Sequence, residues 1–238
     1  MVGNSIVKEV FSSVERPNLY ESVYAQIAQA LIEGRLRPDD KLRIRPLADQ
    51  LGTSITPVRD AILSLVKDGA LESRTPKDVR VPRIQVGQFN EIRMIRLRVE
   101  GLAARLAAQN ANMSDVARLR GILEANEKAR SNDDMYEAIK LNQAFHAEIA
   151  RIAGLPLLRD MIQRLWLRMG PIIAELYPDG GREMIDHHHE ILEAISDRDA
   201  DAAEQAIRED IDSAADILLA KGMLLADEGQ VVILDENV

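Results

Sequence analysis

The feature that most constrains this chain is the spacing of its apolar residues from Phe89 almost to the end. They recur three and four positions apart, which is the period of one helix face, as in the series from Ile92 to Leu106. Short segments rich in Gly, Pro and Asp interrupt the pattern and mark loops. The expected helices span residues 89–110, 114–130, 133–153, 155–177, 182–196 and 200–226. About six antiparallel helices with short loops form a bundle, and bundle cores commonly hold ligands or metals.

The composition supports packed helices and excludes several classes of protein. Aromatic residues make up only 3% of the chain and hydrophobic residues 46%, which favours helices over a β-sandwich. The chain has no cysteine, so disulfide scaffolds and thiol nucleophiles are excluded. No apolar run reaches the roughly 18 residues that span a bilayer. Lys8 and Glu9 interrupt the stretch where a signal peptide would be apolar, and we expect a cytoplasmic protein that does not contact membranes.

The front of the chain shows a helix-turn-helix pattern. A first helix is expected over residues 19–33 and ends at Gly34, and a short second helix over residues 45–51 ends at Gly52. Ser54 or Thr56 can cap a third helix, which tolerates Pro57 in its first turn. A helix, a short Gly-containing turn and a second helix form the helix-turn-helix signature.

Two short expected strands follow the third helix. Residues 71–74 and 79–81 can pair around a tip formed by residues 75–78. A hairpin directly after a recognition helix is a wing, whose tip would bring Lys77 to the DNA backbone or minor groove. Residues 1–84 hold 13 Lys and Arg against 11 Asp and Glu, a net charge of +2. Residues 85–238 have a net charge of −11, which gives −9 for the whole chain. This distribution leaves DNA binding to the front of the chain.

Residues 19–84 resemble the DNA-binding domain of the GntR family of bacterial regulators. The matching motifs are Gly34 to Leu42 (GRLRPDDKL), Leu47-Ala48, Leu51-Gly52, Ser54, Thr56 to Ala61, and Leu65 with Asp68-Gly69. The resemblance implies DNA contacts from the second helix, the recognition helix and the wing. On this chain they fall on Arg45, Ser54, Ile55, Thr56, Arg59 and Lys77.

Each of these residues has an expected partner on double-stranded operator DNA. Arg59 can bond guanine O6 and N7 together, and Ser54 and Thr56 suit phosphate contacts. The chain departs from the family at Ile55, where Arg is usual, and at Asp78, where Gly is usual. Ile55 can touch a thymine methyl instead, which predicts an operator preference different from that of relatives. The alternative is that Arg45 and Arg59 are merely solvated helix charges.

Residues 89–220 resemble the C-terminal domain of the FadR-type subfamily. The resemblance depends on Arg96 to Glu100, Ala107-Ala108, Phe145-His146, and His188 with Ile191 and Ala194-Ile195. It implies a divalent metal, zinc or nickel, on the positions Asn142, His146, His188 and Asp210. Family members usually have Asp in place of Asn142 and His in place of Asp210. The remaining nitrogen and oxygen donors still suit these metals, although an amide is a weak ligand.

The histidines and Arg96 have competing interpretations. Consecutive helical residues point about 100° apart, so only one of His187, His188 and His189 can face an ion. In the alternative, His146 and His188 are hydrogen-bonded core residues without metal. Arg96 either pairs with an internal acid such as Glu100 or binds an organic-acid effector. Trp166, Met161 and Met169 are expected to serve packing.

The sequence as a whole predicts a mainly α protein with two domains. Residues 1–84 form a winged helix-turn-helix, and residues 85–238 form an antiparallel helical bundle for effector binding and dimerisation, with a hinge at residues 85–88. We expect a homodimeric transcription regulator controlled by a small organic acid. A metal-dependent enzyme using the His cluster is the alternative, but no His-Glu-x-x-His motif supports it. A DNA-binding protein without effector is a third possibility. The tail at residues 230–235 is strand-like, with no assigned role.

Overall fold

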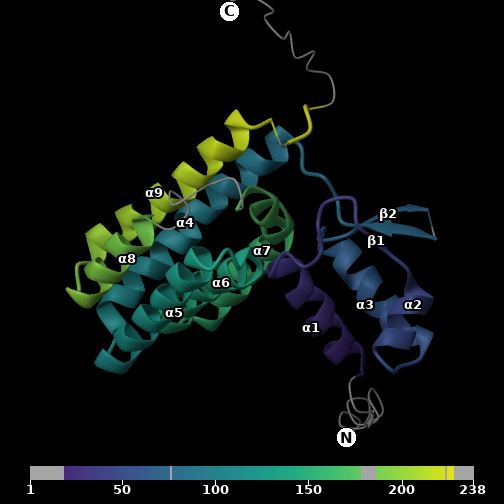
Figure 1. Ribbon diagram of the computed structural model, residues 1–238, viewed down its shortest axis with the longest axis horizontal. Coiled ribbons are helices and arrows are strands. Elements are labelled where there is room, and N and C mark those ends of the chain that lie inside the picture. Colours follow the sequence, from purple (N-terminus) through teal and green to yellow (C-terminus); the bar gives the residue numbers. More distant parts are fainter. Residues whose placement is uncertain (1–18, 76, 178–185, 223, 228–238) are drawn as a thin grey trace, which may run out of the picture.

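The computed structural model describes residues 19–75, 77–177, 186–222 and 224–227. Within them, a small N-terminal part of three helices and a sheet lies beside a bundle of six helices (Figure 1). The predicted fold class, a winged helix-turn-helix followed by an antiparallel helical bundle, is confirmed.

The N-terminal part has the order helix, strand, two helices and a two-stranded wing. The wing strands pair antiparallel, and a short strand from before the helix-turn-helix joins them, which gives the sheet order β1-β3-β2. That two-residue strand was not predicted, because Lys41 and Leu42 are too few for a period to show. The elements are α1 (Leu19–Ile32), β1 (Lys41–Leu42), α2 (Ile44–Gln50), α3 (Ile55–Lys67), β2 (Glu72–Thr75) and β3 (Asp78–Arg80).

The recognition helix α3 is held by its apolar face. Val58, Ile62 and Leu65 are at most 1% exposed and pack with Leu31 of α1 in the hydrophobic core. These are the positions that the 3.6-residue period selects. Packing fixes one side of α3, and its opposite side stays in solvent.

Three of the described bundle helices begin at an Asn or Asp whose side chain caps the first turn. Asn112, Asp134 and Asp199 each accept hydrogen bonds from backbone N–H groups of the first helical turn, which satisfies donors that a helix start leaves unpaired.

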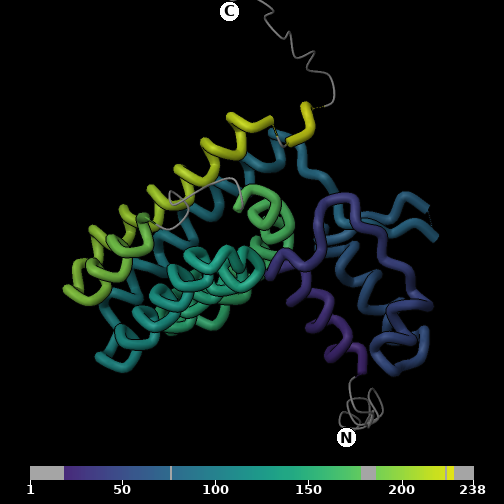
Figure 2. Tube along the Cα trace, in the orientation of Figure 1, coloured from purple at the N-terminus to yellow at the C-terminus, as the bar shows by residue number. Residues whose placement is uncertain are grey.

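Helix α9 runs along α4, and Figure 2 shows the two side by side. The helices are α4 (Val86–Asn110), α5 (Met113–Ser131), α6 (Met135–Ile152), α7 (Pro156–Leu176), α8 (Asp186–Ser196) and α9 (Ala200–Ala220).

The predicted hinge at residues 85–88 is wrong. Gln85 is the N-cap of α4, and its side chain and that of Gln88 form a reciprocal capping box. Amides can exchange these bonds as Ser and Glu do, so α4 starts three residues before Phe89. An isolated parallel bridge joins Gln85 to Leu225.

The last helix is shorter than predicted. It ends at Ala220, because Gly222 adopts a φ of 62°, the left-handed conformation that closes many helices. The start of the helix expected over residues 182–196, at residues 182–185, lies outside the described residues. The strand-like tail at residues 230–235 also lies outside them.

Helices α1 and α7 join the two parts at close range. A Cβ on Gly170 of α7 would lie 2.6 Å from the carbonyl oxygen of Leu31, and one on Gly34 would lie 2.1 Å from the Cβ of Ala174. Both distances are too short for any side chain. Gly170 therefore lets the backbones of α1 and α7 approach directly, and Gly34, just after α1, packs against the side chain of Ala174.

Candidate functional site

The first turn of α3 has exposed polar groups that can bind another molecule. Ser54 is the N-cap residue, but its side chain makes no capping hydrogen bond. Ser54 and Thr56 are exposed, and Ile55 between them is half-buried. The positive end of the helix dipole and the unpaired N–H groups of a first turn attract anions such as phosphate. The geometry therefore suits a phosphate contact by this turn.

Three basic side chains predicted to contact DNA are exposed. Arg45 on α2, Arg59 on α3 and Lys77 in the wing have no ion pair among the residues that the structure describes. In contrast, Lys41 and Arg80 pair with Asp78 at 2.8 and 3.1 Å. The unpaired cations are available to an anionic partner without breaking an internal bond.

Asp78, a departure from the family pattern, has a structural role. Its carboxylate accepts from Lys41 of β1 and from Arg80 of β3, so it ties the wing to the rest of the sheet. The hydrogen bond from Lys41 and the charge of Arg80 lower the pKa of Asp78. The acid at the wing is thus neutralised from within the domain.

A buried polar cluster lies in the bundle, formed by His146 of α6, His188 of α8 and Asp210 of α9. Their exposed fractions are 4%, 1% and 8%, and their potential ligand atoms lie within 4.8 Å of one another. Nε2 of His146 lies 3.4 Å from Oδ2 of Asp210, and Nε2 of His188 lies 3.4 Å from Oδ1 of the same carboxylate. Three helices distant in sequence therefore bring together three of the four residues predicted to bind metal.

A series of polar contacts orients the ring of His146 through Nδ1, the nitrogen that does not face Asp210. Its Nδ1 lies 3.2 Å from Oε2 of Glu100, and Nε of Arg96 donates to Oε1 of the same carboxylate at 2.5 Å. A carboxylate at Nδ1 favours the tautomer that carries the proton there and leaves Nε2 as an acceptor facing Asp210. Such carboxylate–histidine pairs commonly orient metal ligands.

Charge explains why Glu100 stays ionised inside the bundle. Burial alone raises its pKa, but the charge of Arg96 and the hydrogen bond from His146 outweigh burial and lower the pKa to about 2. Arg96 also lies over the ring of Trp166, 4.8 Å from its centroid. Of the two interpretations of Arg96, the structure shows the ion pair with Glu100.

The surroundings of His188 are those of a histidine that binds a metal ion. Both ring nitrogens are buried and have no hydrogen-bond partner among the described residues, and its ring stacks on Phe145 at 4.5 Å. Burial lowers the pKa of His188 well below its usual value and raises that of Asp210. A neutral imidazole facing a carboxylate, beside a second acceptor nitrogen, suits a cation. The alternative of hydrogen-bonded core histidines does not describe His188.

The other predicted residues of this site lie around the cluster. Asn142 is 4% exposed and lies one turn before His146 on α6, hence on the same helix face. His187 and His189 point elsewhere and contact Glu190 and Glu127, so only one residue of the triplet faces inward, as expected.

Sequence reasoning missed the roles of Glu100 and Trp166 in the cluster. Trp166 was assigned to packing, yet its ring centroid is 5.1 Å from that of His146. Its buried Nε1 has no hydrogen-bond partner among the described residues. The only sequence signal for the role of Glu100 was its four-residue spacing from Arg96. That spacing did not reveal that Glu100 also contacts His146.

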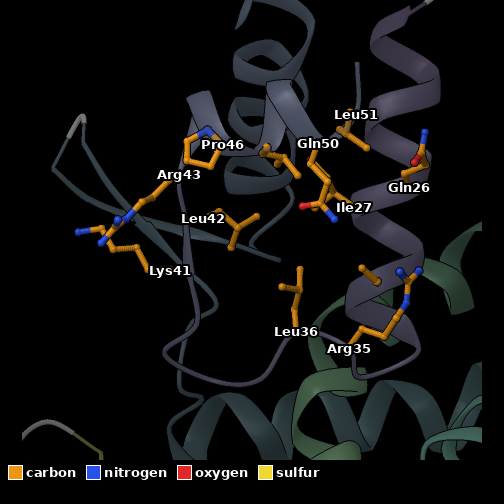
Figure 3. A pocket seen from close by; sticks show the side chains of 12 residues that line it. Gln26, Ile27, Arg35, Leu36, Lys41, Leu42, Arg43, Pro46, Gln50 and Leu51 are labelled. Carbon is orange, nitrogen blue, oxygen red and sulfur yellow. The ribbon is translucent and has the colours of Figure 1, made fainter. Parts of the chain in front are cut away.

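A separate hollow of about 490 Å³ lies in the N-terminal part. Figure 3 shows Ile27, Leu36 and Leu42 around it, with Lys41 and Arg43 toward one edge. None of its lining residues belongs to the buried cluster or to the residues predicted to contact DNA. The hollow lies between α1, α2 and β1.

Among the described helices, none combines the length and apolar character needed to cross a membrane.

Comparisons with known proteins agree with this geometry. Residues 19–81 match the model of the bacterial regulatory proteins of the gntR family, and residues 91–213 match that of the FCD domain. The HTH-type transcriptional regulator McbR of Escherichia coli K12 is 37% identical over 180 residues, which cover 74% of this chain and 81% of that protein. These matches span both parts of the molecule.

Solved structures show the same arrangement. That of E. coli McbR/YncC superimposes with a TM-score of 0.80 at 34% identity, and covers 88% of this chain and 100% of the other. A GntR transcriptional regulator from Rhodococcus sp. RHA1 has a TM-score of 0.71 at 20% identity, with coverage of 86% and 99%, which supports the fold alone.

Proposed function

Because this chain belongs to the gntR family of bacterial regulatory proteins and carries an FCD domain, we propose that the buried cluster controls its binding to operator DNA. The family is one of DNA-binding transcription regulators and not of enzymes, which replaces the alternative of a metal-dependent enzyme.

The DNA interface is proposed to comprise Arg45 of α2, the first turns of α3 and the wing. Arg59 reads a guanine, because a guanidinium can bond O6 and N7 together. Ser54 and Thr56 bind phosphate, and Ile55 contacts a thymine methyl. Arg45 and Lys77 contact the backbone. The exposed, unpaired state of Arg45, Arg59 and Lys77 among the described residues supports this assignment.

The cluster is proposed to hold one divalent metal, zinc or nickel, through His146, His188 and Asp210, with Asn142 as a weak fourth ligand. The carrying observation is that both nitrogens of His188 are buried beside Asp210 and have no hydrogen-bond partner in the part of the chain that the structure describes. A bound metal would supply a Lewis acid that attracts a carboxylate. Glu100 keeps His146 in the ligating tautomer, and Arg96 keeps Glu100 ionised.

The effector is proposed to be a small organic acid that binds beside this cluster. Arg96 supplies a positive charge there, and only its Nε is used on Glu100 in the contacts described, whereas a guanidinium has five N–H donors.

A homodimer then places two α3 helices in successive major grooves. Occupancy of the cluster favours one arrangement of the two wings over the other.

We expect operator affinity to depend on the metal. With a duplex selected from a random pool, Zn²⁺-loaded and chelator-treated protein should differ in Kd by about 5–150-fold, the usual range of such coupling. Fluorescence anisotropy at fixed salt measures it. His188→Ala should abolish the difference, and the matched control His189→Ala should retain it.

Two results would contradict the proposal. Equal affinities of loaded and stripped wild-type protein would separate the cluster from DNA binding. A monomer that bound a half-site duplex as tightly as the full site would exclude the dimer.

A further inference from the structure

One turn of α7 contacts both the buried cluster and the end of the recognition helix. Trp166, which is 4% exposed, faces the bundle core. Arg164 and Arg168, two positions to either side of it, are exposed and reach the N-terminal part. Since a helix turn is a rigid unit, the backbone positions that carry the three side chains move together.

Arg164 holds the residue that ends α3. Its Nη1 donates to Oδ1 of Asp68 at 3.0 Å, and Asp68 is the C-cap of α3. The other oxygen of Asp68 accepts from the hydroxyl of Tyr24 on α1 at 2.8 Å. One carboxylate therefore connects α1, α3 and α7.

Arg168 lies against the backbone directly after this cap. Gly69 has a φ of 72°, and a Cβ placed on it would lie 2.0 Å from Nη2 of Arg168. The guanidinium thus covers the C-terminal end of α3, where the negative end of the helix dipole attracts a cation. A side chain at residue 69 would displace it.

Trp166 links the same turn to the cluster. Its ring lies 5.1 Å from that of His146 and 4.8 Å from the guanidinium carbon of Arg96. A change in the position of His146 or Arg96 therefore reaches α7 through a direct contact. Slightly further along, Gly170 brings the backbone of α7 against that of α1, so the two helices cannot shift independently.

We propose that Arg164 and Arg168 are positioning residues, which couple the state of the cluster, through Trp166, to the orientation of the recognition helix. This inference rests on the proposed function of the cluster. Exposed ion pairs contribute little to stability, and the side chain of Arg164 is 67% exposed. The role of these residues is therefore to transmit a shift and not to hold the fold.

The test compares Arg164→Ala with wild-type protein in the operator assay with and without Zn²⁺. We expect Arg164→Ala to bind Zn²⁺ and to melt like wild type, but to lose most of the metal-dependent change in Kd. Asp68→Asn should have the same effect, and the double variant should add nothing to it. Arg164→Lys should restore part of the response. Arg159→Ala, on the same helix and without an ion pair among the described residues, is the matched control.

A second readout keeps the inference testable if Zn²⁺ has no effect. Coupling is reciprocal, so operator binding should change the emission of Trp166, the only tryptophan of the chain, in wild type and not in Arg164→Ala. If wild type and Arg164→Ala respond equally to Zn²⁺ or, without a metal effect, show the same change in emission, the inference is overturned. Absence of Zn²⁺ binding by wild type would instead contradict the proposed function.

Discussion

Replacing Arg96 by methionine should lower the free energy of unfolding by about 3–5 kcal/mol, because it leaves a buried carboxylate without its cation. Arg96 and Glu100 are 5% and 2% exposed, so solvent cannot replace the lost guanidinium. The low pKa of Glu100 reflects the same dependence. Urea denaturation of the metal-free protein measures the effect.

Two further variants separate the charge from the volume of this side chain. Arg98→Met changes an exposed arginine of the same helix and should alter stability by no more than about 0.5 kcal/mol. Arg96→Met combined with Glu100→Gln should recover part of the loss, because no unpaired charge remains. A loss below about 1 kcal/mol in Arg96→Met would show that the ion pair is not needed by the fold.

Arg59→Ala should weaken operator binding by about 1–3 kcal/mol for each half-site and relax the preference at one base pair. Arg59 is exposed on α3 and has no competing acid among the described residues. Lys77→Ala should weaken binding to all sequences alike and reduce the salt dependence. Anisotropy titrations against the selected duplex and its single-base variants, at several salt concentrations, distinguish the two.

Arg98→Met is again a suitable control, since it lies in the bundle. If Arg59→Ala bound the selected duplex and all its variants as tightly as wild type, the assignment of base reading to α3 would be wrong.

The N-terminal part was largely predictable because its signals are local. Gly34, Gly52 and Gly69 end the three helices as expected, and Pro57 lies in the first turn of α3. The hinge at residues 85–88 was predicted wrongly, since the capping box of Gln85 and Gln88 uses residues that also occur in loops.

The buried cluster was predictable only in part. The resemblance to a family selected His146, His188 and Asp210, and the structure brings them together. The carboxylate behind His146 comes from Glu100, 46 residues away, and no spacing connects the two. The contact of Arg164 with Asp68 spans 96 residues. Contacts of this kind depend on how helices pack, which local patterns do not record.

The most direct test of the account is the metal content of the purified, tag-free protein. Elemental analysis should be carried out before and after dialysis against chelator, and again after reloading with Zn²⁺ or Ni²⁺. We expect about one ion per chain in the wild type and in His189→Ala, and none in His188→Ala. Wild-type protein that holds no metal even after reloading would contradict the assignment of His146, His188 and Asp210 as ligands.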